Sequence, residues 1–304
     1  MRAALEFPLQ LTDAIGNYRS MPLEGGQGGM SRALAVFHGR FGRATVYQLN
    51  RPFNVHAHRE GHLICHIGGT PASIDVCDRR WLLDDSSIVA VNPWEPHNFL
   101  PADLADGAVF FVLYVNAEWF APDVSSGHAL RFGRNHFRRT PLLEKQIRRT
   151  AALVCGAPSL SSLDCELRHL IDICHDESWQ SRDAEPEPRT SAAVTDFRVR
   201  KSIRLMSESP GAEIELDSIA REAGLSRPHF YRLFRTQTGV TPHLYLNTLM
   251  MEQALDALVT TESPIADIGV DLGFSSQSGF TRFFAANVGM APTDYRRAAK
   301  VLRA

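Results

Sequence analysis

The stretch FYRLFRTQTGVTPHLY, residues 230–245, occurs a second time as FTRFFAANVGMAPTDY, residues 280–295. The two copies share an arginine (Arg232 and Arg282), a glycine and a proline in register, in addition to their aromatic positions. Two amphipathic helices that are alike by chance match in their apolar positions alone. The shared arginine and turn residues therefore indicate that the chain carries one helical module twice.

A further helix and a turn precede each copy. The segment LDSIAREAGLSR aligns with IADIGVDLGFSS, and one inserted residue in the turn reconciles this alignment with the first. Gly224 and Gly273 can adopt the left-handed conformation that ends a helix, and Ser226 and Ser275 can cap the helix that follows. The order of helix, glycine turn and second helix predicts two helix-turn-helix units.

The second helix of each unit carries no acid. None occurs between Glu222 and Glu252, or between Asp271 and Asp294. A helix in the major groove has phosphates on both sides, so a carboxylate there is repelled, whereas arginine, glutamine and serine contact the backbone or base edges. We interpret both units as DNA-binding, the alternative being a helical bundle with merely neutral or basic outward faces. From Thr190 onward there are 13 Lys+Arg and 12 Asp+Glu, so nonspecific affinity should be modest and salt-sensitive.

The C-terminal part of the chain resembles the DNA-binding domain of AraC/XylS-type transcriptional regulators, above all in GFSSQSGFTRFF followed by GMAPTDYRR. The resemblance implies two helix-turn-helix units joined by one long helix, here TPHLYLNTLMMEQALDALVTT, with double-stranded DNA and RNA polymerase as partners. The base-facing residues that it implies are Pro228, Tyr231, Arg232, Gln277, Ser278, Gly279 and Arg282. The remaining expected DNA contacts are Ser226, Arg227, His229, Arg235 and Ser276, with Arg227 and His229 at the DNA backbone.

Five positions depart from the family pattern. Gly279 stands where a larger side chain is usual, Ala285 and Ala286 stand where basic residues are common, and Thr248 and Met250 of the joining helix stand where arginines are frequent. We therefore expect the first unit to contribute more affinity for phosphates and the second unit to read fewer bases.

The N-terminal half is rich in short strands. Between residues 44 and 116, the runs ATVYQLN, HLICHIGG, SIDVCD, SIVAVNPWEPH and AVFFVLYVN alternate with turn signals, which is typical of a β-sandwich or barrel. Amphipathic helices over residues 142–154 and 160–179 follow. Their apolar stripes predict packing either on the barrel or on a second subunit, and the family resemblance favours a homodimer.

The segment SRDAEPEPRTS, residues 181–191, is rich in proline and charge and predicts a linker. A chain of 304 residues is long enough for a domain on each side of it. We expect an α+β protein with two domains. Residues 1–180 would form a cupin-like β-barrel with connector helices that binds an effector, and residues 192–304 an all-α double helix-turn-helix domain.

Histidines cluster in the strand-rich segment. HAHREGH places His56 and His58 on one face of a strand, and His97 follows in NPWEPHNF. This spacing resembles a cupin barrel, whose enzymes use such histidines to bind a metal. The sensory domains of AraC-type regulators resemble the same barrel and hold small molecules without metal. The loop before His97 also has a tryptophan and two prolines in place of a glycine-rich turn.

We therefore expect a small-molecule pocket without a metal or cofactor. Its candidate residues are the polar groups His56, His58, Glu60 and His97 and the aromatic walls Trp81 and Trp94. Two alternatives stay open: a metal-dependent cupin enzyme with an appended helical domain, and histidines that are only surface or hydrogen-bonded structural groups. A DNA-repair protein with a reactive cysteine is disfavoured, because clustered cysteine ligands do not precede the helical domain.

Composition and charge identify no partner, and the expectation of a regulator without enzymatic activity comes from the family resemblance. A net charge of −2, with 22% charged and 44% hydrophobic residues, is typical of a soluble globular protein. The first twenty residues have acids and polar groups where a signal peptide needs an unbroken apolar core, and later apolar runs are shorter than a membrane span, so we expect a cytoplasmic protein without a membrane partner. Five cysteines without CxxC spacing predict reduced, mostly buried thiols. The resemblance implies an activator that responds to a small-molecule effector.

Overall fold

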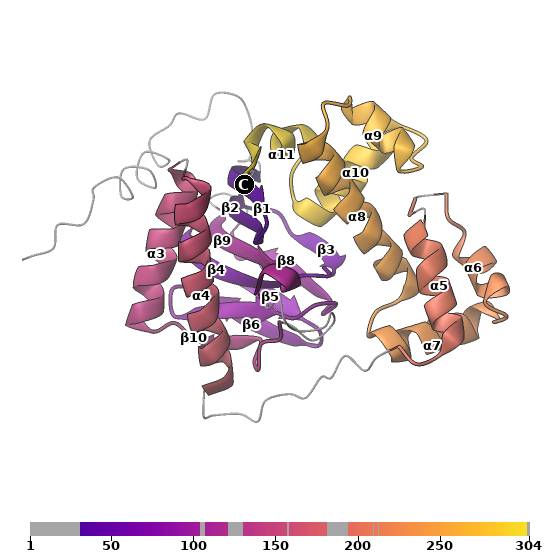
Figure 1. The fold of residues 1–304 in the computed structure, drawn as a ribbon, viewed down its shortest axis with the longest axis horizontal. Helices are drawn as coiled ribbons and strands as arrows, with labels where there is room; N and C mark the ends of the chain where they lie inside the picture. The colour runs from indigo at the N-terminus through magenta and orange to yellow at the C-terminus, as the bar shows by residue number, and fades with distance from the viewer. Residues whose placement is uncertain are drawn as a thin grey trace, which may run out of the picture.

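The computed structural model describes residues 31–302, apart from residues 104–106, 121–129, 157, 181–193, 209 and 212. The expected linker and the N-terminal twenty residues lie outside this described part. A sheet-rich unit precedes a helical unit along the chain, as the sequence predicts (Figure 1).

The strands of the described part form two sheets. The first sheet has the order β10-β7-β4-β9-β2-β1-β11, and the second has the order β3-β8-β5-β6. The strands are β1 (Arg32–Gly39), β2 (Gly42–Leu49), β3 (Phe53–His56), β4 (Gly61–Gly69), β5 (Ala72–Val76), β6 (Arg79–Leu83), β7 (Ser87–Val91), β8 (His97–Pro101), β9 (Ala108–Val115), β10 (His136–Arg138) and β11 (Ala299–Val301).

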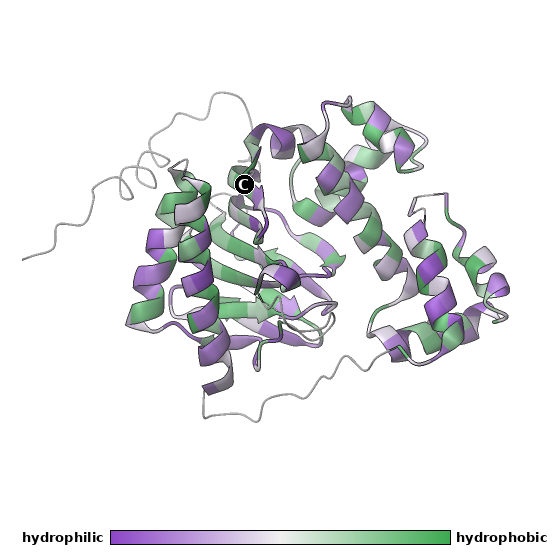
Figure 2. Ribbon diagram, in the orientation of Figure 1, coloured by the Kyte–Doolittle hydropathy of each residue, from purple (hydrophilic) through white to green (hydrophobic). Residues whose placement is uncertain are grey.

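The first sheet is the middle layer of the N-terminal unit, because both of its faces are covered. In β4, Leu63 packs among the buried side chains of α3 (Pro141–Cys155) and α4 (Leu160–Gln180). The next residue, Ile64, points to the other face and packs among the buried side chains of the second sheet. Burial on both faces explains why these strands read as near-continuous apolar runs, visible as green ribbons in Figure 2.

The two helices after the strands begin and end close to their predicted bounds, and their apolar stripes pack on the first sheet. Leu143, Ile147 and Val154 of α3 are almost completely buried within this chain. The Oγ of Thr140 caps α3 by accepting a hydrogen bond from the backbone N–H of Leu143 at 3.3 Å. The stripes therefore belong to the core of one chain, which leaves only outward residues of α3 and α4 for contact with a second subunit. A short helix, α2 (Ala117–Phe120), precedes them.

The C-terminal unit consists of short helices around one long one, as predicted. The long helix α8 joins the two helix-turn-helix units (Figure 1). The helices are α5 (Phe197–Glu208), α6 (Leu216–Glu222), α7 (Arg227–Thr238), α8 (Pro242–Thr260), α9 (Ile265–Asp271), α10 (Gln277–Val288) and α11 (Pro292–Ala298). Gly224 and Gly273 have φ of 70° and 77°, which confirms the predicted left-handed turns.

One predicted cap is wrong by a residue. Ser226 is the N-cap of α7 as expected, but the N-cap of α10 is Ser276 and not Ser275. The inserted residue of the second copy lies before the cap, so Ser276 is the equivalent of Ser226. Its Oγ accepts a hydrogen bond from the backbone N–H of Gly279 at 3.2 Å.

The aromatic stripes of both copies form the core of the units. Phe230 and Phe234 of α7 are fully buried, as are Phe280 and Phe284 of α10. Leu233 and Phe283, which the repeat also places in these stripes, are only half-buried. The stripes match the predicted faces and leave the arginine of each copy on the outside.

The C-terminal unit docks on the N-terminal unit. Strand β11 adds to the edge of the first sheet, where Phe37 lies opposite Lys300 in a parallel pair with β1. Nε2 of His38 lies 2.8 Å from the hydroxyl of Tyr295. Phe284 of α10 and Tyr295 of α11 share one buried cluster with the second sheet.

The five cysteines are free thiols, and only Cys65 and Cys174 are buried. The expectation of mostly buried thiols is therefore wrong, because Cys155 and Cys165 face outward on α3 and α4. In the part of the chain that the structure describes, all helices are too short or too polar to cross a membrane.

Candidate DNA-binding and effector sites

Most of the predicted DNA-contacting side chains are exposed. The exposed members are Ser226, Arg227, Pro228, Arg232, Arg235, Ser276, Gln277, Ser278 and Arg282, and the half-buried ones are His229, Tyr231 and Gly279. All lie on or immediately before α7 and α10, the second helices of the two units. These polar side chains lie at the surface of α7 and α10, while the buried aromatic stripes hold both helices in place.

In the first unit, Arg227 is held beside α6. Its guanidinium lies 3.1 Å from a carboxylate oxygen of Asp217, and both side chains are exposed. The same guanidinium lies 5.7 Å from the ring centroid of Tyr231. An exposed ion pair contributes little free energy, so releasing Arg227 from Asp217 costs little.

In the second unit, the end of α10 is pressed against the N-terminal unit. Gly289 has φ of 80°, and a Cβ added there would lie 2.1 Å from Cε1 of Phe53 in β3. The equivalent Gly239 of the first unit has φ of 82° and nothing within 4 Å of such a Cβ. The two units therefore differ in environment at this position: β3 packs against the end of α10, whereas the corresponding end of α7 is open.

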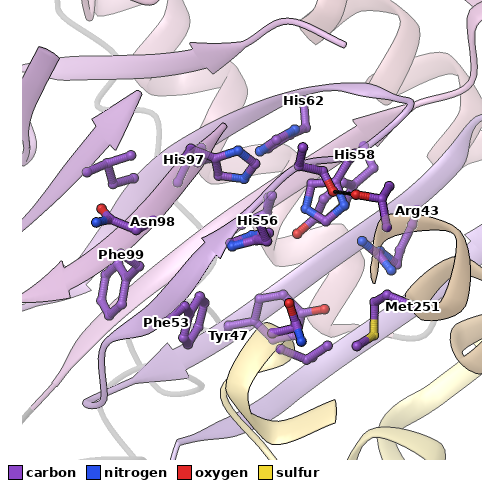
Figure 3. A pocket seen from close by; sticks show the side chains of 18 of the residues that line it. Arg43, Tyr47, Phe53, His56, His58, His62, His97, Asn98, Phe99 and Met251 are labelled. Atoms are coloured by element: carbon purple, nitrogen blue, oxygen red, sulfur yellow. Dashed lines mark hydrogen bonds between the residues drawn. The ribbon is translucent and has the colours of Figure 1, made fainter. Parts of the chain in front are cut away.

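A cavity lies where the two units meet. Its volume is about 60 Å³, several times the roughly 10–15 Å³ that one water needs. The second sheet, the first sheet, α8 and α10 all contribute walls (Figure 3). The lining residues are Arg43, Tyr47, Leu49, Phe53, His56, Ala57, His58, His62, Ile64, Ile74, His97, Asn98, Phe99, Phe110, Val112, Tyr114, Leu244, Asn247, Thr248, Met251, Leu255, Asn287 and Val288.

Four histidines gather on one side of this cavity. His56 ends β3 and lies directly opposite His97 of the neighbouring strand β8, with 4.2 Å between the ring centroids. The ring centroid of His58 is 5.0 Å from that of His56 and 5.3 Å from that of His97. His58 lies in the loop after β3, so the two histidines of HAH converge without sharing a strand face. His62 comes from β4 and adds a fourth ring, 4.7 Å from that of His97.

These imidazoles are neutral at physiological pH. Burial lowers the pKa of His56 to about 4 and that of His62 to about 3. Burial, together with the neighbouring histidines, also holds the pKa values of His58 and His97 well below their usual range. A cluster of four rings can share one buried site because none of them carries a charge.

Arg43 brings a permanent positive charge into the same cavity. Its side chain, from β2, is 7% exposed and hydrogen-bonds the hydroxyls of Tyr114 and Tyr295. The guanidinium carbon lies 3.7 Å from the ring centroid of Tyr114. Its Nε is buried without a hydrogen-bond acceptor among the described residues. Both phenols are neutral acceptors, and the carboxylate of Glu60, outside the cavity lining, is an opposite charge that acts on Arg43. The unpartnered Nε leaves a charged donor available for an anion.

Three of the expected pocket residues do not line the cavity. Trp81 stacks on His136 at 4.9 Å between ring centroids, on the far edge of the second sheet. Trp94 stacks on Tyr245 of α8 at 4.4 Å, and Glu60 also lies outside the lining. The structure brings together only His56, His58 and His97 of the predicted set.

Sequence reasoning missed Arg43, His62, Tyr114 and Met251. A strand such as GRATVYQL gives no sign that its arginine points inward. The spacing in HAHREGH could have signalled His62, because it follows the histidine pair closely. The contribution of α8 and α10 has no local signal, since it depends on how the two units dock.

The loop that carries His58 is also fastened to α8. The backbone carbonyl of Ala57 accepts a hydrogen bond from the Oγ1 of Thr248 at 3.2 Å. Arg59 pairs with Glu252 of the same helix. The backbone N–H of Trp94, whose ring stacks on α8, donates to the carbonyl of His58 at 2.8 Å.

Comparisons with known proteins agree with this organisation. The family of helix-turn-helix domains matches residues 219–298. The regulatory protein SoxS of Salmonella typhimurium is 35% identical over 98 residues, which cover 32% of this chain and 92% of SoxS. The probable transcriptional regulator LumQ of Photobacterium leiognathi is 33% identical over 155 residues, which cover 45% of this chain and 62% of LumQ.

A solved structure extends the similarity to both units. The unsaturated fatty acid-bound ToxT of Vibrio cholerae superposes with a TM-score of 0.54, over 90% of this chain and 97% of ToxT. Sequence identity in the superposition is 14%, so the similarity is one of fold.

Proposed function

Because this chain belongs to the AraC/XylS family of DNA-binding transcriptional regulators, we propose that it places α7 and α10 in two successive major grooves on one face of its operator. The two grooves are about 34 Å apart along the duplex. One observation carries the proposal: both helices are free of acids and expose an arginine at the same position, Arg232 and Arg282. The other exposed polar side chains of the two helices would supply backbone and base contacts.

Selection of DNA from a random library by the full-length protein tests this proposal. We expect enriched sequences with two half-sites centred about 10–10.5 bp apart. A variant with Arg232→Ala and Arg282→Ala should lose the enrichment. The matched control, Arg79→Ala with Arg80→Ala, removes the same charge from exposed positions of β6 and should retain it. A wild-type protein that enriches no sequence would contradict the proposal.

The cavity between the two units is the proposed effector site. Apolar walls from both sheets and α8 surround a polar end formed by the histidines and Arg43, which suits a small organic anion with an apolar body. The buried guanidinium supports the negative charge, because its Nε lacks an acceptor among the described residues. An unsaturated fatty acid, the ligand of the similarly folded ToxT, has this combination of groups.

Effector binding would act through the docking of the helical unit. The walls include Met251 of α8 and Val288 of α10, so a ligand of the right shape binds one docked arrangement better than another and shifts the population toward it. We further propose that the protein is cytoplasmic and activates transcription by contacting RNA polymerase at the promoter. The cavity has a regulatory and not a catalytic role in this proposal.

A homodimer would use the outward side of α3 and α4. Leu142 is 57% exposed and Trp179 is 48% exposed, and they lie on α3 and α4 at residues that the sheet does not cover. Sedimentation of the wild type and of a Leu142→Glu variant tests this contact. We expect the wild type to sediment as a dimer and the variant as a monomer.

A further inference from the structure

We propose that the cavity binds a divalent transition-metal ion through the imidazoles of His56, His58 and His97, with His62 as a fourth ligand. The inference rests on the proposed regulatory cavity and deepens it, because it names the chemical class of a ligand that binds there. The ion has a binding role, next to the site for the organic anion.

The geometry of the three rings suits one ion. The ligand nitrogens of His56, His58 and His97 all lie within 4.8 Å of one another. Metal–nitrogen bonds of about 2.0–2.1 Å at tetrahedral angles hold two nitrogens about 3.3 Å apart, so the rings need to move by about 1 Å to converge. His62 lies close enough to join them, with 5.1 Å between its ring centroid and that of His58 (Figure 3).

Backbone carbonyls set two of the rings in the tautomer that binds metals. Nδ1 of His56 lies 2.8 Å from the carbonyl oxygen of Asn54, and Nδ1 of His97 lies 2.9 Å from that of Glu95. A carbonyl oxygen only accepts, so each Nδ1 carries the hydrogen and each Nε2 keeps its lone pair. Metal-binding histidines are oriented by this kind of hydrogen bond on the second ring nitrogen.

The other two rings have buried nitrogens without partners. Nε2 of His58 and Nδ1 of His62 have no hydrogen-bond partner among the residues that the structure describes. His62 is only 1% exposed. Leaving a buried polar atom unsatisfied is unfavourable, and a shared metal ion would satisfy both nitrogens together.

The ligand set selects the kind of ion. Neutral imidazoles suit zinc, copper, nickel and iron, whereas calcium and magnesium require oxygen ligands. The histidine cluster contains no carboxylate, and Arg43 adds a positive charge to the same cavity. An anion at an open coordination position, facing Arg43, would offset both charges. The metal and the organic anion are therefore complementary ligands of one cavity.

The segments that hold the ion also hold the helical unit. His56 and His58 flank Ala57, whose carbonyl binds Thr248 of α8. Phe53 of the same strand touches the end of α10 at Gly289. Drawing the histidines together by about 1 Å would move residues that contact both α8 and α10.

Titration of the metal-free, full-length protein with Zn²⁺ or Co²⁺ alone tests the proposal. We expect one ion per chain, a Co²⁺ absorption spectrum typical of nitrogen ligands, and a higher melting temperature with Zn²⁺. His56→Gln and His97→Gln should each lower the affinity for the metal ion by about 10- to 100-fold or more. Removing a residue that only hydrogen-bonds a metal ligand already causes a loss of this size.

The control is His169→Gln, an exposed histidine of α4 that should leave metal affinity unchanged. Circular dichroism shows whether each variant is folded, and the wild-type stoichiometry and Co²⁺ spectrum test the site without any variant. A wild-type protein that takes up no stoichiometric ion would overturn the proposal. So would equal affinities in the wild type and a folded His56→Gln, His97→Gln double variant.

A negative result in the metal titration can be told apart from a negative result in the DNA selection. The titration contains neither DNA nor an organic ligand, and the DNA selection needs only α7 and α10. A protein that enriches its operator but binds no ion remains a regulator with a metal-free cavity.

Discussion

Arg232 and Arg282 occupy the same position in the two copies, but their neighbours differ. Arg227 and Arg235 accompany Arg232 on α7, whereas Arg282 is the single basic residue of α10. The second helix of the first unit therefore carries more positive charge, which is the basis for expecting a larger share of the phosphate affinity there.

We predict that Arg232→Ala lowers specific DNA affinity by about 1–3 kcal/mol, because it removes an exposed charged donor from the proposed DNA-contacting side of α7. Binding to the selected operator, measured over a range of salt concentrations, checks the change. Arg79→Ala serves as the control, since it removes an exposed charge from β6 of the N-terminal unit. Salt curves of Arg232→Ala and wild type that coincide would refute the prediction.

His38 makes the stability of the docked protein depend on pH. Burial, followed by the charge of Arg43, lowers its pKa to about 3. Above pH 6.5 the ring is neutral in both the folded and the unfolded chain. As the pH falls from 6.5 towards 3, only the unfolded chain binds the proton, so the free energy of unfolding decreases.

His38→Gln should therefore flatten this pH dependence by up to about 1.4 kcal/mol per pH unit, while the glutamine can still bond to Tyr295. Urea denaturation at several pH values between 7 and 5 measures it. His169→Gln is the control, because that histidine is exposed on α4. Parallel curves for His38→Gln and the wild type would count against the assignment.

At the scale of elements, the contact between β3 and the end of α10 distinguishes the second unit from the first. Gly289 and Gly239 have nearly the same left-handed φ, but only Gly289 has a neighbour, Phe53, where a Cβ would be. Comparing the same substitution at Gly239 and at Gly289 therefore isolates the effect of the contact with β3.

Gly239→Ala should cost about 1–2 kcal/mol of folding free energy, from the left-handed backbone alone. Gly289→Ala should cost more, since the new Cβ collides with Phe53. Adding Phe53→Ala should remove most of the extra cost, which a double-mutant cycle by chemical denaturation measures. Equal costs at the two glycines would show that β3 does not press on α10 in solution.

The elements that could be predicted from sequence are those with strong local signals. The repeat and its glycine turns define α6, α7, α9 and α10, and apolar runs define the central strands. The short strands β3 and β8 are harder to predict, since FNVH and HNFLP are polar at alternate or neighbouring positions and lie in the smaller sheet. Strand β11 has no apolar pattern of its own, and it forms because β1 offers an open edge.

At the scale of the whole molecule, most of the cavity lining could not be predicted. The histidines stand out in the sequence because of their type and spacing. Arg43 and Met251 do not, because each belongs to an element whose pattern is satisfied without a ligand. Their part in the cavity arises from the docking of two units that are far apart in the chain.

A fragment that begins near Thr190 should fold and bind DNA by itself, because both helix-turn-helix units and α8 lie within it. It should melt at a lower temperature than the full chain, since the docked faces of α10 and α11 lose their buried partners in the second sheet. Thermal melts and DNA titrations of the fragment check both statements. An insoluble or inert fragment would argue against an independent C-terminal domain.

The pairing of β11 with β1 has a consequence for the regulator once it leaves its docked arrangement. Separation of the helical unit uncovers the backbone N–H and C=O groups of Val36, Phe37 and His38 along the rim of the first sheet. A bare rim of this kind recruits strands from other molecules. We therefore expect the undocked protein to self-associate more readily than the docked one, through the edge of β1 that β11 covers in the docked arrangement.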